Sequence, residues 1–274
     1  RKESHYRMLK RLELKKQDFK KIKKICDKNK IEFLSTPYDL ESVELLQQLK
    51  VKSFKIASAD LVDMILHKKI ISTKKPVILS VGMANMSEIK KTVNFYKKKG
   101  MSKITLLHCV SNYPCSLESL NLKVILRLKK LFNVPIGFSD HSEGNIAAAI
   151  AVSFGATIIE KHFTLNKNLS GPDHLASCNP KEFSSYVKSI RKAEIMLGED
   201  VKKCQPEEIE MKKISRKSIT LKKAMKINQI VREKDIIMKR PGTGINGQKR
   251  HLVIGKKLKK NLNKDHQINF QDIA

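Results

Sequence analysis

The sequence contains no tryptophan, and Phe and Tyr bring its aromatic content to only 5% of 274 residues. No run of 18 apolar residues occurs, and the chain opens on a charged stretch without an apolar signal region. These absences argue against a membrane-spanning helix and against a secretory leader. We therefore expect a cytoplasmic protein with no membrane partner.

Cysteine is also scarce, and its spacing carries no motif. The five cysteines are odd in number and widely separated, and no two of them form a C-x-x-C pair. Neither a disulfide framework nor a structural zinc site is indicated. We expect reduced thiols.

Acidic residues are few: 27 Asp and Glu stand against 56 Lys and Arg, which gives a net charge of +29. Such a charge can indicate nucleic-acid binding. However, the lysines are spread over nearly every predicted helix, few Phe and Tyr lie among them, and no nucleic-acid motif is present. We interpret the charge as a solvated surface that attracts anionic substrates, and we expect no nucleic-acid partner.

What the first two-thirds of the chain does contain is an alternation of short apolar runs and amphipathic stretches, with a polar cluster after each run. This rhythm predicts α/β structure with parallel strands, and a spacing of about 25 residues fits a (β/α)8 TIM-type barrel. The predicted strands are 31–34, 53–56, 77–79, 104–107, 135–138 and 157–159. The predicted helices include 12–28, 38–49, 86–99, 122–131, 145–154 and 180–197.

Six predicted strands are two fewer than a barrel needs, and such a barrel normally takes about 250 residues. We therefore expect a TIM-type barrel domain at 1–198 that lacks its first two strands in this chain. Residues 199–214 are charged and are predicted to be a linker. Residues 215–274 are predicted to form a small β-rich domain, because short β-like runs at 218–221, 235–239 and 252–254 are separated by Gly and Asn turns.

Two histidines end consecutive predicted strands. Because the carboxyl ends of parallel strands meet at one mouth of a barrel, His141 and His162 are expected to lie close together. Two imidazoles with open positions suit a divalent metal that acts as a Lewis acid, although each histidine could instead be a hydrogen-bonded core residue. Glu160 beside Lys161, and Asp140 beside His141, could supply acid/base chemistry or form buried ion pairs.

The other strand ends carry one ammonium group and several hydroxyls, which can together hold a phosphate or a carboxylate. These residues are Thr36, Lys55, Ser58, Ser80 and Ser139. Any single Ser or Thr at such a position could equally cap the helix that follows.

These polar clusters occur in the order in which they are found in sialic acid synthases. The matching motifs are Ser35-Thr36-Pro37, Lys55-Ile56-Ala57-Ser58, Ser80-Val81-Gly82-Met83-Ala84, Gly137-Phe138-Ser139-Asp140-His141, Glu160-Lys161-His162-Phe163-Thr164-Leu165 and Gly171-Pro172-Asp173-His174. The tail around Lys239-Arg240-Pro241-Gly242-Thr243-Gly244 resembles the small antifreeze-like (SAF) β-clip domain that ends these enzymes. The resemblance covers almost the whole chain.

The resemblance implies a transferase that condenses phosphoenolpyruvate with N-acetylmannosamine and releases phosphate, which makes it an N-acetylneuraminate synthase. The alternatives are an N,N'-diacetyllegionaminate synthase, another phosphoenolpyruvate-dependent sugar-acid synthase, and an inactive sugar-binding relative. The implied cofactor is Mn²⁺ or Mg²⁺, held by His141 and His162. Together with Glu160 these histidines are the implied catalytic residues.

The resemblance also implies a substrate-binding set and a domain-swapped homodimer, in which Arg240 of one subunit reaches the sugar bound by the other. The implied substrate-binding residues are Thr36, Lys55, Ser58, Asp60, Ser80, Ser111, Tyr113, Ser139, Asp173 and Arg240. Asp60 departs from the pattern, because the family usually has a glutamate there. The first two strands normally supply a glutamate, a lysine and a glutamine to the site, and none of the three is present here.

Overall fold

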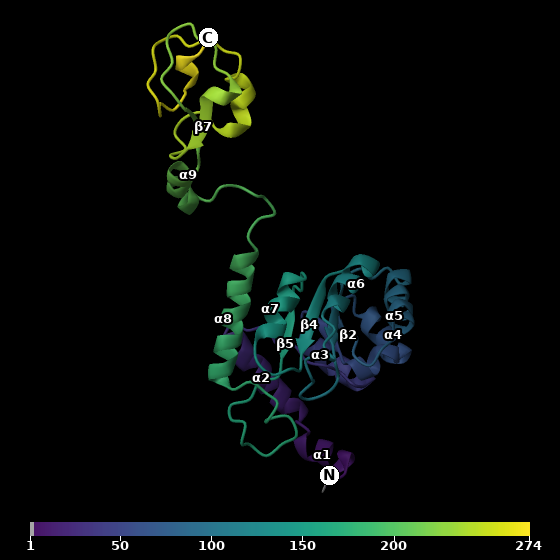
Figure 1. Cartoon of the computed structure of the whole chain (residues 1–274). Helices are drawn as coiled ribbons and strands as arrows, with labels where there is room; N and C mark the ends of the chain where they lie inside the picture. The colour runs from purple at the N-terminus through teal and green to yellow at the C-terminus, as the bar shows by residue number, and fades with distance from the viewer. Residues whose placement is uncertain (1–2) are drawn as a thin grey trace. The chain divides into compact units, whose positions relative to one another are not determined.

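The computed structural model describes residues 3–274, and the chain forms two compact units, of which the first ends at Gly198 and the second begins at Glu199 (Figure 1). In the first unit strands and helices alternate. Its elements are α1 (His5–Leu12), α2 (Lys16–Lys28), α3 (Leu40–Gln48), β1 (Phe54–Ile56), a 3₁₀ turn (Ser58–Val62), α4 (Met64–Ser72), β2 (Val77–Ser80), α5 (Met86–Lys98), β3 (Ile104–Cys109), α6 (Lys123–Phe132), β4 (Ile136–Asp140), α7 (Ile146–Ser153), β5 (Ile159–Lys161) and α8 (Pro180–Leu197).

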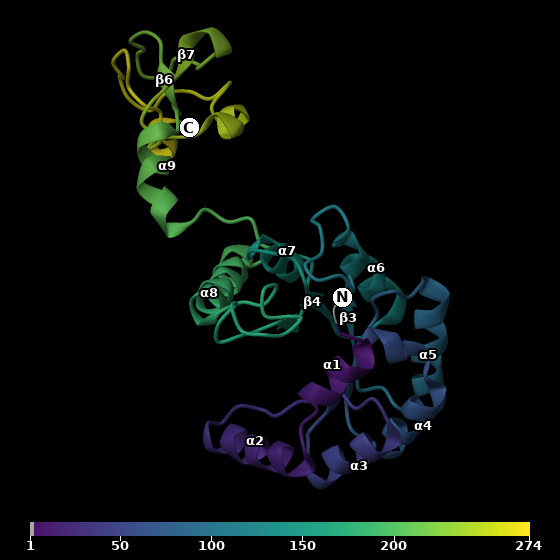
Figure 2. The same ribbon diagram turned by 90° about the horizontal axis from the view of Figure 1, so that it is seen from below.

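The strands form one five-stranded parallel sheet in the order β1-β2-β3-β4-β5, which confirms the predicted parallel α/β architecture. Figure 2 shows helices α2 to α8 arranged in an arc around the strands. The sheet is therefore a half-barrel, with helices on its convex side. Whether further strands complete it stays a prediction.

The core of this unit lies between the sheet and the helices, and strand residues such as Phe54, Leu79 and Phe138 are fully buried there. Local signals fix where helices begin. Asn85 caps α5 by accepting from the backbone N–H of Glu88 (3.1 Å), while the Glu88 carboxylate accepts from the N–H of Asn85 (2.8 Å). This reciprocal pair satisfies backbone donors that a helix start leaves unpaired.

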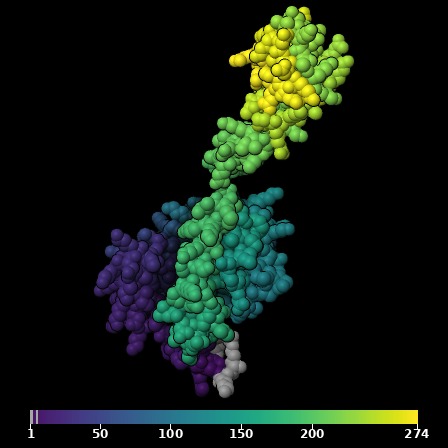
Figure 3. Space-filling view, turned by 60° about the vertical axis from the view of Figure 1, so that its left-hand side comes forward, coloured from purple at the N-terminus to yellow at the C-terminus, as the bar shows by residue number. Residues whose placement is uncertain are grey.

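The predicted first strand, Ile31–Leu34, is wrong: in the described residues this segment has no strand partner, and Ile31 is 64% exposed. An apolar run becomes a strand only when a neighbour accepts and donates backbone hydrogen bonds. A cavity of about 470 Å³ lies between Leu34 and the β5–α8 side of the unit. Figure 3 shows α8 as the green ridge that runs along the first unit.

Three further predictions differ from the structure for local reasons. The predicted helix 12–28 begins only at Lys16, because the Asp18 carboxylate accepts from the N–H of Lys15 (3.2 Å) and starts α2 there, while Leu12 ends the separate helix α1. Helix α4 was not predicted, although Asp63 caps it. The run Leu252–Ile254 is not a strand, because a 3₁₀ helix (Gly247–Leu252) takes up the backbone locally.

The second unit contains a two-stranded antiparallel sheet, formed by β6 (Ser218–Leu221) and β7 (Ile236–Lys239). The predicted linker region contains α9 (Ile209–Ser215) and a 3₁₀ turn (Pro206–Glu208). Two more 3₁₀ turns, Glu233–Asp235 and Phe270–Asp272, complete the unit around its own small apolar core. In residues 3–274 no helix combines the length and the apolar character that a membrane span requires.

Candidate active site

The inner face of the half-barrel carries the polar residues that end β4 and β5. β5 begins at Ile159, later than predicted, so Glu160 lies inside the strand and pairs with Ser139 in the sheet register. Because side chains alternate along a strand, Ser139 and His141 share one face with Glu160 and His162. The imidazole rings of His141 and His162 are 5.4 Å apart, centre to centre, and nearly perpendicular.

A hydrogen bond and a close contact through Ser139 join these residues. The Ser139 hydroxyl donates to Glu160 Oε1 (2.6 Å) and lies 3.2 Å from His141 Nε2. On the other side of the ring, His141 Nδ1–H donates to the carbonyl of Val110 (2.6 Å), which leaves Nε2 as the free lone pair. Burial lowers the pKa of His141. The hydrogen bond to Val110 opposes this shift, and the nearby His162 adds to it. The ring is therefore neutral at pH 7.

A buried lysine lies at the same mouth. Lys55 of β1 is 7% exposed, and its ammonium donates to Ser80 Oγ (2.7 Å) at the end of β2. The same nitrogen lies 3.5 Å from Glu160 Oε2 across the half-barrel. It also donates to the carbonyl of Ile56 (3.3 Å), so each of its three donors has a partner. A phosphate or carboxylate ligand would bind this buried ammonium by replacing one of these partners.

Gly82, two residues after Ser80, packs tightly against three neighbouring side chains. The hydroxyl of Ser58 accepts from the N–H of Gly82 (3.0 Å) and lies 3.2 Å from the Cys109 thiol. A Cβ on Gly82 would come within 2.4 Å of Ser111 Oγ and 2.8 Å of Cys109 Sγ. A side chain at position 82 would therefore displace the hydroxyls of Ser58 and Ser111 from their places beside Gly82.

Tyr113 covers the two histidines. Its ring centre is 4.2 Å from that of His141 and 5.1 Å from that of His162. Burial raises the pKa of Tyr113, and the charges of Cys109 and Asp173 raise it further. The exposed Asp173 carboxylate therefore lies within electrostatic range of the Tyr113 phenol. The phenol therefore stays protonated and can donate a hydrogen bond to a ligand.

Asp60 has an unused acceptor. Its Oδ2 atom is buried and has no hydrogen-bond partner among the described residues. Burial, and then the nearby Asp63, raises the pKa of Asp60. A buried carboxylate oxygen without a partner is costly, and a ligand hydroxyl could pair with this atom only after a local rearrangement uncovers it.

Two predicted residues are not joined to this cluster. Thr36 is half-buried in the segment after α2, and no hydrogen bond links its side chain to the other predicted residues in the described chain. Arg240 belongs to the second unit, where its Nε donates to the carbonyl of Ser215 (3.0 Å).

The sequence analysis missed two contributors to the cluster. Cys109 ends β3 and lies against Ser58, but a cysteine after an apolar strand gives no signal of its own. Burial, and then the charges of Asp60 and Glu160, raise the pKa of Tyr38, so its phenol lies within electrostatic range of both carboxylates. The preceding Pro37 was included in a motif, and the aromatic residue after it was overlooked.

The open question about Asp140 and Lys161 is resolved by the structure. The carboxylate of Asp140 and the ammonium of Lys161 are 3.2 Å apart, and both side chains are almost fully buried on the outer face of the sheet. These two residues therefore form a buried ion pair rather than part of the open cluster.

The two histidines fit a divalent metal in part. A neutral His141 with its Nδ1–H fixed by a backbone carbonyl is the usual state of a ligating imidazole. In residues 3–274 no group of three or more His, Cys, Asp or Glu residues could hold a metal ion. The donor set therefore suits a cation that takes two imidazole nitrogens and completes its coordination with water or substrate oxygens.

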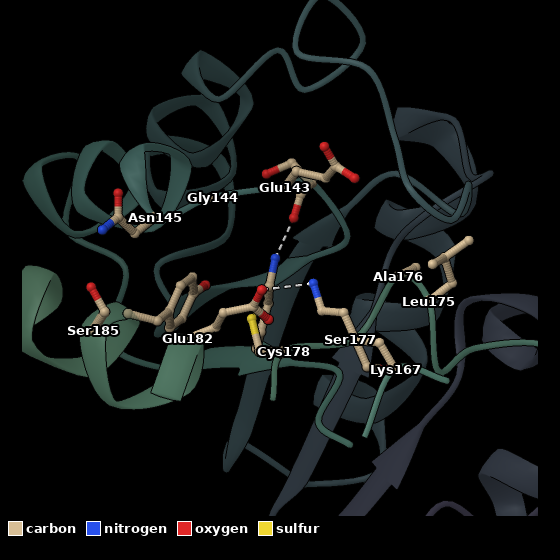
Figure 4. A pocket seen from close by; sticks show the side chains of 13 residues that line it. Glu143, Gly144, Asn145, Lys167, Leu175, Ala176, Ser177, Cys178, Glu182 and Ser185 are labelled. Carbon is tan, nitrogen blue, oxygen red and sulfur yellow. Dashed lines mark hydrogen bonds and ion pairs between the residues drawn. The ribbon is translucent and has the colours of Figure 1, made fainter. Parts of the chain in front are cut away.

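A second pocket, of about 390 Å³, lies behind β4 and β5 on the outer side of the sheet. Figure 4 shows Glu143, Cys178 and Ser185 around it, with an ion pair between Lys167 and Glu182 (2.9 Å) at its side. Its carboxylates and lysines balance one another, so it carries no clear preference for a cation or an anion.

Comparisons with known proteins point to one family. The family model described as the NeuB family matches residues 1–202. N,N'-diacetyllegionaminic acid synthase of Campylobacter jejuni is 41% identical over 268 residues, which are 97% of this chain and 80% of that protein.

Solved structures agree in fold. The crystal structure of an N-acetylneuraminic acid (sialic acid) synthetase from Leptospira borgpetersenii, in complex with citrate, matches with a TM-score of 0.71 at 38% identity, covering 75% of this chain and 72% of that one. A Chromobacterium violaceum protein assigned to spore coat polysaccharide biosynthesis matches with a TM-score of 0.83 at 24% identity, covering 97% and 80%, and supports the fold alone. This chain therefore belongs to the NeuB family, the family of the sialic acid synthases.

Proposed function

We propose that this chain condenses phosphoenolpyruvate with an N-acylated mannosamine-type sugar, as an N-acetylneuraminate synthase. The observation that carries the proposal is the convergence of Lys55, Ser80 and Ser139 with Glu160 and the histidine pair on one face. This combination offers an anion site beside a carboxylate and two metal-competent nitrogens. In the reaction, the methylene carbon C3 of phosphoenolpyruvate bonds to the sugar's aldehyde carbon, whose oxygen gains a proton and becomes a hydroxyl. Water adds at C2, and phosphate leaves from that carbon.

The donor site is formed by the buried lysine and its neighbours. Lys55 binds the phosphate or carboxylate of phosphoenolpyruvate, with the hydroxyls of Ser80, Ser139 and Ser58 as further partners. Glu160, held by Ser139 and 3.5 Å from Lys55, takes the proton of the attacking water. Ser111, whose hydroxyl lies beside Gly82 and Ser58, is assigned to the same side, and Thr36 is assigned to it from the family motif alone.

The acceptor sugar lies on the other side of the pair of histidines. Tyr113 packs over both rings and donates to a sugar oxygen, while Asp60 and Asp173 accept from sugar hydroxyls. His141 and His162 are the residues that would hold Mn²⁺ or Mg²⁺, which when bound supplies Lewis-acid polarisation of the aldehyde oxygen.

The second unit contributes Arg240 to the site of a partner subunit in a domain-swapped homodimer. Its side chain is exposed, and no carboxylate pairs with it in residues 3–274, so its charge is available for a ligand. We assign this unit to the SAF type on the strength of its Arg240-Pro241-Gly242 loop.

A second acceptor is favoured by one observation. The Campylobacter jejuni relative, named as an N,N'-diacetyllegionaminic acid synthase, is 41% identical over nearly the whole chain. The 2,4-diacetamido-trideoxy sugar that leads to legionaminic acid is therefore the competing substrate.

The test is phosphate release from phosphoenolpyruvate by the purified chain with Mn²⁺, in the presence of either sugar or of none. Release that requires N-acetylmannosamine supports the proposal, and mass spectrometry identifies the nine-carbon product. Release that requires only the diacetamido sugar supports the competing acceptor. An inactive sugar-binding relative would bind a sugar without any release.

A further inference from the structure

A buried polar network lies on the outer face of β4 and β5, directly behind the histidine pair. Asp140 is fully buried, and its carboxylate accepts four hydrogen bonds or ion-pair contacts. Oδ1 accepts from the N–H (2.9 Å) and the hydroxyl (2.7 Å) of Ser142. Oδ2 accepts from the phenol of Tyr186 on α8 (2.8 Å) and forms an ion pair with the ammonium of Lys161 (3.2 Å).

The network brackets His141. Because the Asp140 side chain holds the backbone of Ser142, the peptide units on both sides of His141 are fixed. Lys161 reinforces the same turn, since its ammonium also donates to the carbonyl of Ser142. Lys161 is itself the residue between Glu160 and His162, so one side chain ties the two strand ends together.

A buried ion pair is weak evidence for a stabilising role, because the cost of removing two charges from water offsets their attraction. Apolar residues of similar size would fill this face of the sheet equally well. A network that is fully hydrogen-bonded does, however, specify one geometry. Here that geometry is the position of two adjacent strand ends.

We propose that Asp140, Lys161 and Tyr186 are positioning residues, which set the separation and orientation of His141 and His162 from behind the sheet. The inference rests on the proposed function of those histidines. None of the three residues touches the ligand side of the site. Their effect passes through the backbone of β4 and β5.

Two mild substitutions test this inference without removing either buried charge. Tyr186→Phe and Ser142→Ala each delete one donor to Asp140 and keep the packing. Tyr96→Phe is the matched control, because Tyr96 is an equally buried phenol that bonds His67 Nδ1 (2.7 Å) away from the site. All three are expected to lower the melting temperature.

The discriminating readouts are Mn²⁺ affinity, measured by electron paramagnetic resonance without substrate, and the kinetic constants. We expect Tyr186→Phe and Ser142→Ala to weaken Mn²⁺ binding about tenfold, at the lower end of the range for residues that orient metal ligands. We also expect a fall in kcat, with the KM for phosphoenolpyruvate nearly unchanged. Tyr96→Phe should change neither readout.

If both variants keep the Mn²⁺ affinity and kcat of the wild type while losing thermal stability as Tyr96→Phe does, the network is purely structural and the inference is wrong. Failure of the proposed function is distinguishable from this result. In that case the unaltered chain itself shows no sugar-dependent phosphate release, whereas the Mn²⁺ measurement still compares the variants.

Discussion

The sharpest mutational prediction concerns Lys55. Substitution by Met keeps an unbranched side chain of similar length and removes only the ammonium group. In the folded chain Glu160 keeps the hydrogen bond from Ser139, and its side chain is 38% exposed, so the loss of Lys55 leaves no deeply buried unpaired charge. We therefore expect the free energy of unfolding to change by only about 1 kcal/mol.

The effect on the donor should be much larger. A hydrogen bond from a charged group contributes about 1.5–3 kcal/mol, which corresponds to about tenfold to 150-fold in kcat/KM for phosphoenolpyruvate. The assay is initial-rate phosphate release at saturating sugar with phosphoenolpyruvate varied. The matched control is Lys52→Met, because the Lys52 side chain is 79% exposed and forms only a 3.5 Å surface contact with Glu32. Equal phosphoenolpyruvate kinetics for Lys55→Met and Lys52→Met would refute the donor site.

The remaining predictions concern the metal, the dimer and pH. His141→Ala should abolish Mn²⁺-dependent phosphate release, and calorimetry should show weaker Mn²⁺ binding; unaltered binding would overturn the ligand assignment. Mixing Lys55→Met chains with Arg240→Ala chains should restore part of the activity, because one hybrid site then has both residues, and no recovery would contradict the swap. Burial lowers the pKa of His67 below its ordinary 6.5, so the unfolded state binds more protons and stability falls as pH drops below about 6.5. Urea denaturation of His67→Gln should show a pH slope flatter by at most about 1.4 kcal/mol per pH unit, and an identical slope would show that His67 does not titrate on unfolding.

The candidate site was accessible to sequence reasoning because strand ends are a local signal with a fixed spatial meaning. In a parallel sheet the residues that follow each strand meet at one edge, so Lys55, Ser80, Ser139 and Glu160 could be grouped before any contact was known. The structure brings these four together through direct contacts.

The predicted strands that proved wrong lie where structure depends on partners distant in the chain or on competing local hydrogen bonds. The run Ile31–Leu34 has the composition of a strand, but pairing is decided by a neighbour that its own sequence does not encode. At Leu252 the competition is local, since 3₁₀ backbone hydrogen bonds that begin at the Asn246 carbonyl take up the backbone. The role of Asp140 stayed open because sequence cannot tell whether a carboxylate beside a histidine points to the site or, as here, to Tyr186 behind the sheet.

The most direct test of the central claim is phosphate release from phosphoenolpyruvate by this chain with Mn²⁺ and N-acetylmannosamine, with the Lys55→Met variant run in parallel. The account predicts release that requires the sugar and is strongly reduced in the variant. Release that proceeds equally without sugar, or that Lys55→Met leaves unchanged, would contradict it.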